Sequence, residues 1–441
     1  MDASGVEGGE SSGHRSNTTT PCKDATRPSP SPLNGAESSG LRRALAHAGF
    51  RRLFAAQTIS RGGDTFNSVA LVILVYRLTG SGLKVAGTVA FEIVPVVVLG
   101  FVAGAVADRY PRRRVMVGAD LGRAGIALVL VFFHDQLAVV YLAAFSLSAF
   151  SVFFNPAAAS ILPALVPAED VVGANSAVWS AAVISQIALA PLAGALVAIA
   201  GPGPAFAVNG LSFFASAALI ARLPIAGRAA VVAEKYLHDV AEGLSAIRAS
   251  RFLCVLAGVQ GLAALSAGAT SALLVVLASE HLDVGPGQFG LLIAAIGIGA
   301  GLGPLVFQRV VDDVRRPSFI FGPYLLRGAV DLVLAASSRF AVALGALSLY
   351  GVGTSTGNVT YNSVLQTTVP DRLRGRVFAF YDIVWQAARL LSIGVGGVLA
   401  DQLGISAVYW AGGGLLLVAG GVGLVAAGAP GSPALSDGPA R

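Results

Sequence analysis

Residues 104–125, "GAVADRYPRRRVMVGADLGRAG", gather two aspartates and five arginines in a chain that is only 12% charged and 55% hydrophobic. Apolar runs of about twenty residues flank this stretch on both sides. A run of that length can cross a bilayer as a helix, because about 20 residues span about 30 Å of hydrocarbon. The stretch is therefore interpreted as a charged loop between two membrane-spanning helices, with the next helix beginning inside it.

Similar apolar runs recur along the whole chain. Roughly a quarter of the residues of a soluble globular protein are charged, so this composition and a mean hydropathy of +0.73 indicate a polytopic membrane protein. The runs are long and continuously apolar, whereas a membrane β-barrel needs short alternating segments. We expect an all-α fold with twelve transmembrane helices. The expected spans are 53–76, 83–106, 115–133, 138–160, 172–200, 203–223, 252–279, 287–311, 318–336, 340–364, 377–400 and 405–427.

Lysine and arginine lie mostly on one side of these spans. The other side carries only Arg77 and Arg339, with Lys84 at a helix end. By the positive-inside rule, the arginine-rich side and both termini are cytoplasmic, which predicts a multi-pass protein of the cell membrane. The high alanine and glycine content favours a bacterial source. The net charge of +6 is then explained by topology and by contact with anionic lipids rather than by nucleic-acid binding.

The first six spans resemble the second six. A shift of 204 residues places Asp108 on Asp312 and Arg123 on Arg327. Parallel six-span repeats are typical of transporters whose substrate binds between the halves near the bilayer midplane. We therefore expect two pseudo-symmetric six-helix bundles. The expected segments are a disordered tail at 1–40, bundles at 41–224 and 252–428, a linker with an amphipathic helix at 225–251, and a tail at 429–441.

Three motifs resemble the major facilitator superfamily. Gly104-x-x-x-Asp108-Arg109-x-x-Arg112-Arg113 is similar to the superfamily's loop motif after span two, with Pro111 in place of the usual glycine. "VVGANSAVWSAAVISQIALAPLAGAL" (171–196) and "RGRVFAFYDIVWQAARL" (374–390) resemble its bacterial efflux branch, which includes enterobactin and macrolide exporters. The resemblance covers residues 41–427 and implies the twelve-helix major facilitator fold and export of small molecules.

Two departures from the branch concern spans four and five. Span four lacks the arginine that many proton antiporters place there. In span five the efflux signature Gly-Pro-x-x-Gly-Gly is reduced to Pro191 and Gly194. The resemblance therefore implies an exporter, with proton coupling to be carried by other residues.

The loop motif is expected to act as a conformational latch, meaning a contact between the halves that closes the cytoplasmic side. The Asp108 carboxylate can accept hydrogen bonds from arginines or from a helix N-terminus of the other half. Such a latch favours the outward-open state. The alternative is that the arginines only fix the topology. The latch residues are Asp108, Arg109, Arg112 and Arg113 with Gly104, and a weaker second latch is expected at Asp312, Arg315 and Arg316.

Several charged residues lie inside expected spans. A charge at the middle of a membrane helix costs about 2.5–3.5 kcal/mol on insertion scales, so each calls for a partner or a function. A carboxylate that faces a cavity can bind and release a proton during transport. The candidates for proton or substrate coupling are Asp64 first, Glu92 second, and Arg61, Asp382 and Arg389. The alternatives are a structural salt bridge between Asp64 and Arg61, and a site for an anionic substrate group at Arg389.

Two further pairs share helix faces, and other side chains are suited to a cavity. Asp120 and Arg123 are three residues apart, and Arg327 and Asp331 are four apart, so each pair can form an ion pair. They either fix helix packing or relay changes to the latch. Candidate cavity-lining residues are Phe66, Asn67, Phe153, Phe154, Asn155, Asn358, Tyr361, Asn362 and Trp385.

The predicted function is proton-coupled export of small amphipathic molecules by alternating access, and the alternative is a gradient-driven uptake symporter. An enzyme is not favoured, because the five histidines are scattered and no metal-ligand spacing occurs. An ATP-driven pump lacks its G-x-x-x-x-G-K-[ST] motif. A receptor on the same fold would bind without transport. The expected partners are a small-molecule substrate, protons and lipids, with no cofactor, and the chain is expected to be a monomer.

Overall fold

A computed structural model describes residues 43–224, 244, 247–248, 250–310, 313 and 316–428. Within these ranges the chain is helical without strands, and twelve helices have 19 residues or more. The long helices are α2 (Ala48–Thr79), α3 (Gly82–Arg109), α4 (Arg112–Phe133), α5 (Leu137–Ile161), α6 (Val171–Ala200), α7 (Gly203–Ala221), α9 (Arg251–Ala272), α11 (Pro286–Val310), α12 (Pro317–Ala336), α13 (Phe340–Thr368), α14 (Asp371–Leu403) and α15 (Ile405–Gly428). The short elements are η1 (Leu162–Ala164), η2 (Ala168–Asp170), α10 (Leu274–Val276) and η3 (Leu277–His281).

Glycines end the helices at the tightest turns. Gly80, Gly201 and Gly404 follow α2, α6 and α14 with φ of 59°, 78° and 84°. A side chain with a Cβ rarely adopts this region, whereas glycine enters it freely and ends a helix there. The next helix can then start within three residues, as α3 does at Gly82. The sequence thus specifies adjacent antiparallel helices with minimal loops.

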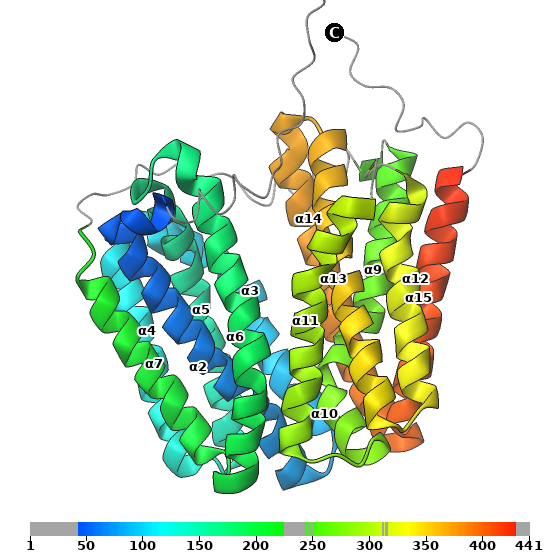
Figure 1. The fold of residues 1–441 in the computed structure, drawn as a ribbon, viewed down its shortest axis with the longest axis horizontal. Coiled ribbons are helices and arrows are strands. Elements are labelled where there is room, and N and C mark those ends of the chain that lie inside the picture. The colour runs from blue at the N-terminus through cyan, green and yellow to red at the C-terminus, as the bar shows by residue number, and fades with distance from the viewer. Residues whose placement is uncertain are drawn as a thin grey trace, which may run out of the picture.

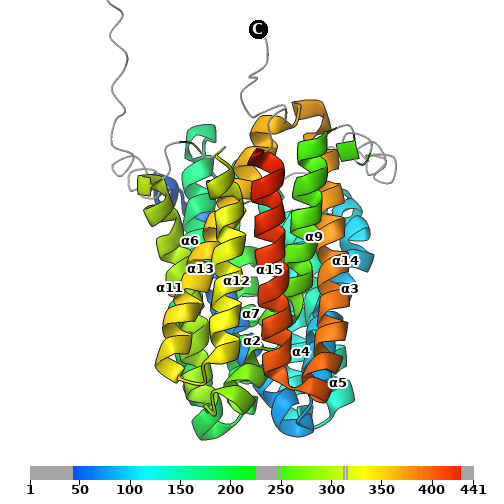
Figure 2. The same ribbon diagram turned by 90° about the vertical axis from the view of Figure 1, so that its right-hand side faces the viewer.

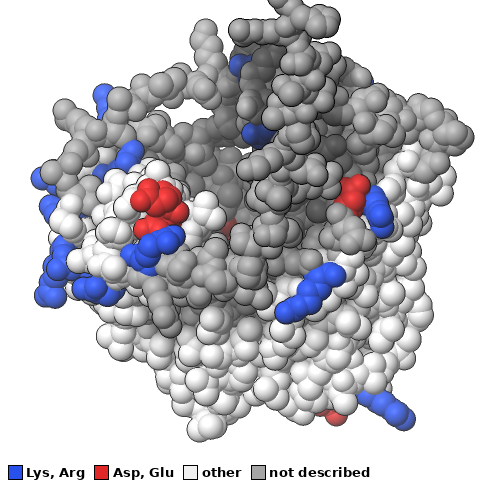
Figure 3. Space-filling view, turned by 45° about the horizontal axis from the view of Figure 1, so that its top comes forward, with Lys and Arg blue, Asp and Glu red and all other residues white. Residues whose placement is uncertain are grey.

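The helices suit a membrane in length and composition. Eleven of the twelve long helices in the described part of the chain are apolar enough to cross a bilayer. The twelfth, α2, has the required length but carries Arg61, Asp64 and Asn67 in its middle. Figure 3 shows lysines and arginines gathered near one end of the molecule above a broad uncharged surface. These features confirm the expected all-helical membrane fold.

The helices form two bundles of six (Figure 1). The first half contains α2 to α7 and the second half contains α9 and α11 to α15. The bundles are separate at the end where α2 begins and α15 ends, which we call the terminal end, and they meet at the opposite end, which we call the far end (Figure 1). Figure 2 views the molecule from the side of the second half, with α15 in front. The helices of the two bundles therefore diverge from the far end toward the terminal end.

Helix neighbours in the first half recur in the second. In the first half, α7 packs on α2 and α4, and α5 packs on α3 and α4. In the second half, α15 packs on α9 and α12, and α13 packs on α11 and α12. Each helix thus has a counterpart six spans later with the same neighbours. This is the arrangement that the repeated charged residues of the sequence predict.

Three hydrophobic cores among the described residues follow the same division. Two of them lie near the terminal end, one built around Phe50 and Ile161 in the first half and one around Phe321 and Val377 in the second. The third lies at the far end and joins residues of both halves, such as Leu74 and Leu277. Of these three cores, the one at the far end is the one that joins the two halves.

The structure corrects the expected spans at two places. Span seven, expected to be continuous over 252–279, is broken at Leu273, and α10 and the π-helical turn η3 follow. No proline or glycine marks this break, so hydropathy gives no sign of it. Span eleven, expected at 377–400, already begins at Asp371, because Pro370 starts the helix and Arg374 and Arg376 lie in its first turns. The tails and most of the amphipathic linker, including Val232, Tyr236 and Val240, lie outside the described residues.

Candidate functional site

Each half contains a pocket, and the two pockets occupy equivalent positions. The first pocket, about 370 Å³, lies among α2, α4, α5 and α6. The second pocket, about 230 Å³, lies among α9, α12, α13 and α14, which are the counterparts of those four helices. The matching arginines Arg123 and Arg327 each line the pocket of their own half. The repeat therefore extends from the helices to their cavities.

The first pocket is polar and contains the leading candidate for proton coupling. Asp64 lies half-buried near the middle of α2, and Arg61 lies exposed one turn before it. Phe154 and Asn155 of α5, two of the expected lining residues, complete the wall. No ion pair joins Arg61 to Asp64 among the described side chains, so the structural salt bridge considered from the sequence is wrong for this conformation.

Arg123 is buried behind this pocket in a dense set of contacts. Its guanidinium donates to the Asp120 carboxylate, whose side chain is fully buried. The guanidinium carbon also lies 4.5 Å from the ring centre of Phe154 and 4.3 Å from that of Phe213. Cation–π contact with two rings and an ion pair together compensate a charge removed from water. The structure thus brings Asp120 and Arg123 together.

Arg327, the counterpart in the second half, has a different partner. It donates to the Tyr350 hydroxyl at 2.9 Å and lies over the Tyr350 ring. The buried Asp331 accepts a 3.5 Å hydrogen bond from Ser266, and no ion pair joins it to Arg327 among the described residues. The expected Arg327–Asp331 pair is therefore wrong as a direct contact. Tyr350 on α13 reaches the guanidinium, a competition that spacing within one helix could not predict.

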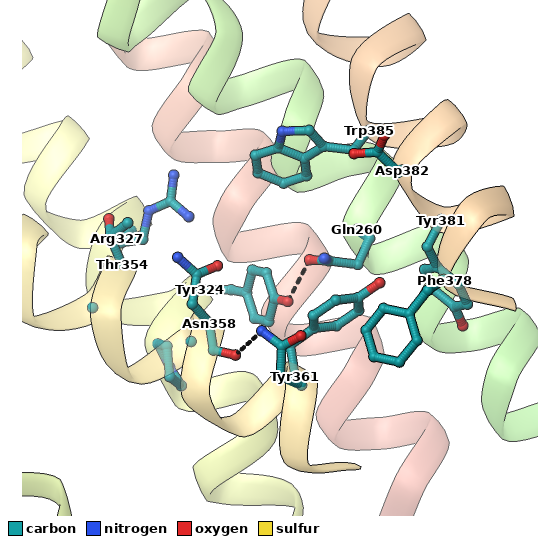
Figure 4. Close-up of a pocket in the computed structure, with 14 residues that line it drawn as sticks. Gln260, Tyr324, Arg327, Thr354, Asn358, Tyr361, Phe378, Tyr381, Asp382 and Trp385 are labelled. Carbon is teal, nitrogen blue, oxygen red and sulfur yellow. Dashed lines mark hydrogen bonds between the residues drawn. The ribbon is translucent and has the colours of Figure 1, made fainter. Parts of the chain in front are cut away.

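The second pocket is rich in aromatic and amide groups (Figure 4). The Tyr324 hydroxyl donates a hydrogen bond to Gln260 Oε1 at 2.6 Å. The Tyr361 ring packs edge-on against the Tyr381 ring, with their centres 5.7 Å apart. Asp382 and Trp385 of α14 extend over one side of the pocket, where the Asp382 side chain is exposed. The further expected lining residues found here are Asn358, Asn362, Tyr361 and Trp385. Flat rings beside hydrogen-bonding groups suit an amphipathic molecule.

Buried charges connect the two halves. The charge of Asp64 interacts with those of Arg123 and Glu92 in the first half. Glu92 on α3 in turn interacts with Arg389 on α14, and these two helices pack together across the interface. Both side chains are half-buried. Arg61 also acts on Asp64, so four of the five expected coupling residues form one electrostatic series, whereas Asp382 lies apart from it in the second pocket.

The loop motif lies at the terminal end, where the halves are separate. Gly104 and Asp108 lie in the last two turns of α3, and their side-chain positions are outside what the structure describes. Arg112 donates to the Ser160 carbonyl at 2.9 Å and Arg113 to the Leu223 carbonyl at 3.2 Å, both within the first half. The exposed Arg109 ends α3. In the second half, Arg316 directly precedes α12, and Asp312 and Arg315 lie outside the described residues.

The span-five motif lies at a close crossing between the halves. A Cβ added to Gly194 on α6 would come within 3.2 Å of the backbone of Gly290 on α11. A Cβ added to Gly290 would come within 2.9 Å of Pro191 Cα. Both glycines therefore permit backbone contact between α6 and α11. Pro191 and Gly194 serve the interface of the halves rather than a pocket wall.

Sequence reasoning missed the polar contacts at the far end. The Tyr76 hydroxyl donates to Glu280 at 2.8 Å, which links α2 to η3. Asp401 near the end of α14 accepts hydrogen bonds from Ser81 and Gly82 at the start of α3. The sequence does carry a signal for Asp401. It is an acidic residue in the last turn of a span, as Asp108 is in the last turn of α3.

Comparison with known proteins agrees with this architecture. The family described as "Transmembrane secretion effector" matches residues 40–431. The "Multidrug efflux pump Tap" of Mycolicibacterium fortuitum is 28% identical over 81% of this chain and 90% of that protein. "Macrolide efflux protein A" of Streptococcus pyogenes is 22% identical over 82% of this chain and 91% of that protein. "Enterobactin exporter EntS" of Escherichia coli is 24% identical over 81% of this chain and 86% of that protein.

Solved structures share the fold at lower identity. A bacterial homologue of the iron transporter ferroportin in its inward-facing state has a TM-score of 0.70 at 16% identity, covering 86% of this chain and 99% of that one. The outward-facing structure under the same description has a TM-score of 0.57 with the same coverage. The paired bundles, the repeated pockets and the family match agree, and the chain belongs to the transmembrane secretion effector family of the major facilitator superfamily.

Proposed function

We propose that this protein exports small amphipathic molecules across the cell membrane by alternating access. The relatives named as macrolide, multidrug and enterobactin exporters support export, and none of these names describes uptake or an enzyme. The second pocket supports the substrate class, because its aromatic rings and side-chain amides can bind a molecule with apolar and polar parts.

One observation carries the mechanism: equivalent pockets lie in two halves that are joined at the far end and separate at the terminal end. Rocking of one half against the other would close the terminal end and open the far end around the same pockets. With the arginine-rich terminal end in the cytoplasm, the present conformation is inward-facing. The higher TM-score with the inward-facing ferroportin homologue supports this assignment.

Proton coupling is proposed to run through Asp64, Glu92 and Arg389. A guanidinium close to a carboxylate favours its ionised form. Glu92 and Arg389 lie on opposite halves, so rocking changes their separation. Glu92 would release its proton when Arg389 is near and bind one when Arg389 moves away. Asp64, which faces the first pocket, would exchange this proton with water.

The remaining proposals concern the cytoplasmic side and the assembly. Asp108 with Arg109, Arg112 and Arg113 is proposed to latch the terminal end in the outward-facing state, and the segment boundaries at 41–224 and 252–428 are proposed as the two moving bodies. Both termini are proposed to be cytoplasmic. The chain is proposed to act as a monomer, because both pockets are built from its own helices.

The test is dye efflux from energised cells preloaded with a panel of fluorescent amphipathic dyes, with and without a protonophore. Wild type should export at least one dye, and the protonophore should abolish export. Glu92→Gln should lower the rate at least tenfold while leaving the protein in the membrane, since it removes the ionisable group without changing the volume. The matched control is Glu169→Gln, an exposed carboxylate in η2 that should retain full export.

Two results would contradict the proposal. Accumulation of a substrate into cells, rather than its loss, would establish the uptake alternative. Full protonophore-sensitive export by Glu92→Gln would remove Glu92 from the coupling pathway, and Asp64→Asn would then be tested in the same assay.

A further inference from the structure

We propose that Asp401 helps to hold the far end closed, as a carboxylate cap on the first turn of α3. Its Oδ2 accepts a hydrogen bond from Ser81 Oγ at 2.6 Å, and its Oδ1 accepts one from the Gly82 backbone N–H at 2.6 Å. The Leu83 N–H lies 3.4 Å from both carboxylate oxygens. Asp401 belongs to the second half and the capped helix to the first. This inference rests on the alternating access proposed above.

The contact has the chemistry of a strong helix cap. The first backbone N–H groups of a helix have no partner inside it, and they carry the positive end of the helix dipole. A carboxylate satisfies these groups with charge-assisted hydrogen bonds. Helix caps normally come from the residue just before the helix. Here Ser81 occupies that position and bonds to Lys84 N–H, while the charge is supplied by α14 of the other half.

Glycines make room for this contact. A Cβ added to Gly82 would come within 2.9 Å of Ala400 Cβ and 3.2 Å of Asp401 Oδ1. A Cβ added to Gly397 would come within 2.8 Å of Leu83 Cα. The backbones of α3 and α14 therefore touch at the far end only because both positions lack a side chain. Asp401, Gly82 and Gly397 together therefore form the contact between α3 and α14 at the far end.

The same pair of helices carries a corresponding acid at the terminal end. Helices α3 and α14 are antiparallel, since the end of α14 meets the start of α3. Asp108 lies one residue before the end of α3, and Asp401 lies two residues before the end of α14. Each acid is thus placed at the end of the membrane where the partner helix begins. The far-end contact is made in the present conformation, in which the bundles are separate at the terminal end (Figure 1).

Asp401 is suited to a contact that must break in every transport cycle. Its side chain is exposed, so water can replace the hydrogen bonds on both partners when the far end opens. An exposed charged contact shifts a two-state equilibrium without locking it. The far-end apolar core and the Tyr76–Glu280 hydrogen bond act in the same direction. We therefore assign Asp401 as a positioning residue that sets which end is open.

The experiment measures distances between spin labels in the purified full-length protein, with Cys22 and Cys254 replaced by serine. One label pair, at Phe133 and Arg339, reports the far end, and another, at Val172 and Val310, reports the terminal end. Asp401→Asn should raise the ratio of open to closed far-end distances about tenfold, because it removes a charged hydrogen-bond acceptor. The terminal-end distances should shorten correspondingly. The control Asp135→Asn changes an exposed carboxylate in the loop between α4 and α5 and should leave both distributions unchanged.

A second variant separates the carboxylate from the fit of the helices. Gly397→Val retains Asp401 but places a side chain between α14 and α3, which pushes the two helices apart. It should shift both distance distributions in the same direction as Asp401→Asn. Unchanged distances in Asp401→Asn overturn the proposal, whether or not Gly397→Val shifts them. Dye export by the same proteins tests the proposed function separately. Shifted distances in Asp401→Asn, together with a wild type that exports no dye, would leave the Asp401 contact standing and refute the exporter.

Discussion

Replacing Asp120 by asparagine tests how the buried charges of the first half are balanced. Asp120 is fully buried, and Arg123, its partner, is only 4% exposed. Removing one partner of a buried ion pair costs about 3–5 kcal/mol, because the other charge remains without compensation. Arg123 retains its contacts with Phe154 and Phe213 in the variant, which limits the loss. We therefore expect Asp120→Asn to lower the free energy of unfolding by about 3 kcal/mol.

The second half supplies a matched comparison. Asp331 is just as buried, but its hydrogen bond from Ser266 is long, and Arg327 is satisfied by Tyr350. Asp331→Asn should therefore cost about 1 kcal/mol, the value of one ordinary hydrogen bond. Restoring an uncharged core with Asp120→Leu and Arg123→Met together should recover most of the loss of the single variant.

The assay is reversible unfolding of the purified protein in mixed micelles by increasing amounts of dodecyl sulfate, followed by tryptophan fluorescence. The midpoint and slope give the free energy of unfolding of each variant. Equal losses for Asp120→Asn and Asp331→Asn would refute the reasoning, because only Asp120 is ion-paired with its arginine. A double variant less stable than Asp120→Asn would also refute it.

Two further predictions concern the second pocket and the interface. Trp385→Ala removes an aromatic face from the second pocket and should raise the KM for dye export roughly tenfold with little change in kcat, whereas Trp410→Ala, half-exposed on α15, should change neither. Gly290→Ala puts a methyl group against the backbone of α6 and should abolish export while the protein still reaches the membrane, as judged by membrane fractionation. Gly287→Ala, one turn earlier with open space around it, should export normally, and loss of export there would show that the close crossing is not the cause.

The helices were predictable because each span is long, apolar and bounded by turn residues. Gly80 and Gly201 mark turns, and the described helices begin and end within a few residues of the expected limits except around Leu273 and Pro370. The division into equivalent halves was predictable from matching charges such as Arg123 and Arg327. The break at Leu273 was not, because it occurs in an unbroken apolar run whose residues all pack into the far-end core.

The site was predictable only in part, because the spacing of residues in the sequence predicts contacts within one helix and not contacts between helices. Asp120 and Arg123 form an ion pair as neighbours on one helix face. Arg327 instead donates a hydrogen bond to Tyr350, which belongs to another helix. The interaction of Glu92 with Arg389 joins residues almost 300 positions apart, and no local pattern encodes it. Charged residues inside spans were thus identified correctly as exceptional, while their partners required the fold.

The break at Leu273 has a consequence for how the far end can open. The segment after the break, α10 with η3, packs against α2 of the opposite half and lines with it a cavity of about 160 Å³. The segment before it, α9, packs against α14 and α15 of its own half. Span seven therefore ends in a short segment that bridges the halves, because η3 contacts α15 of its own half and accepts a hydrogen bond from Tyr76 of α2 in the other. In the proposed transport cycle this bridging segment must therefore exchange its contacts with α2 or with α15 whenever the far end opens.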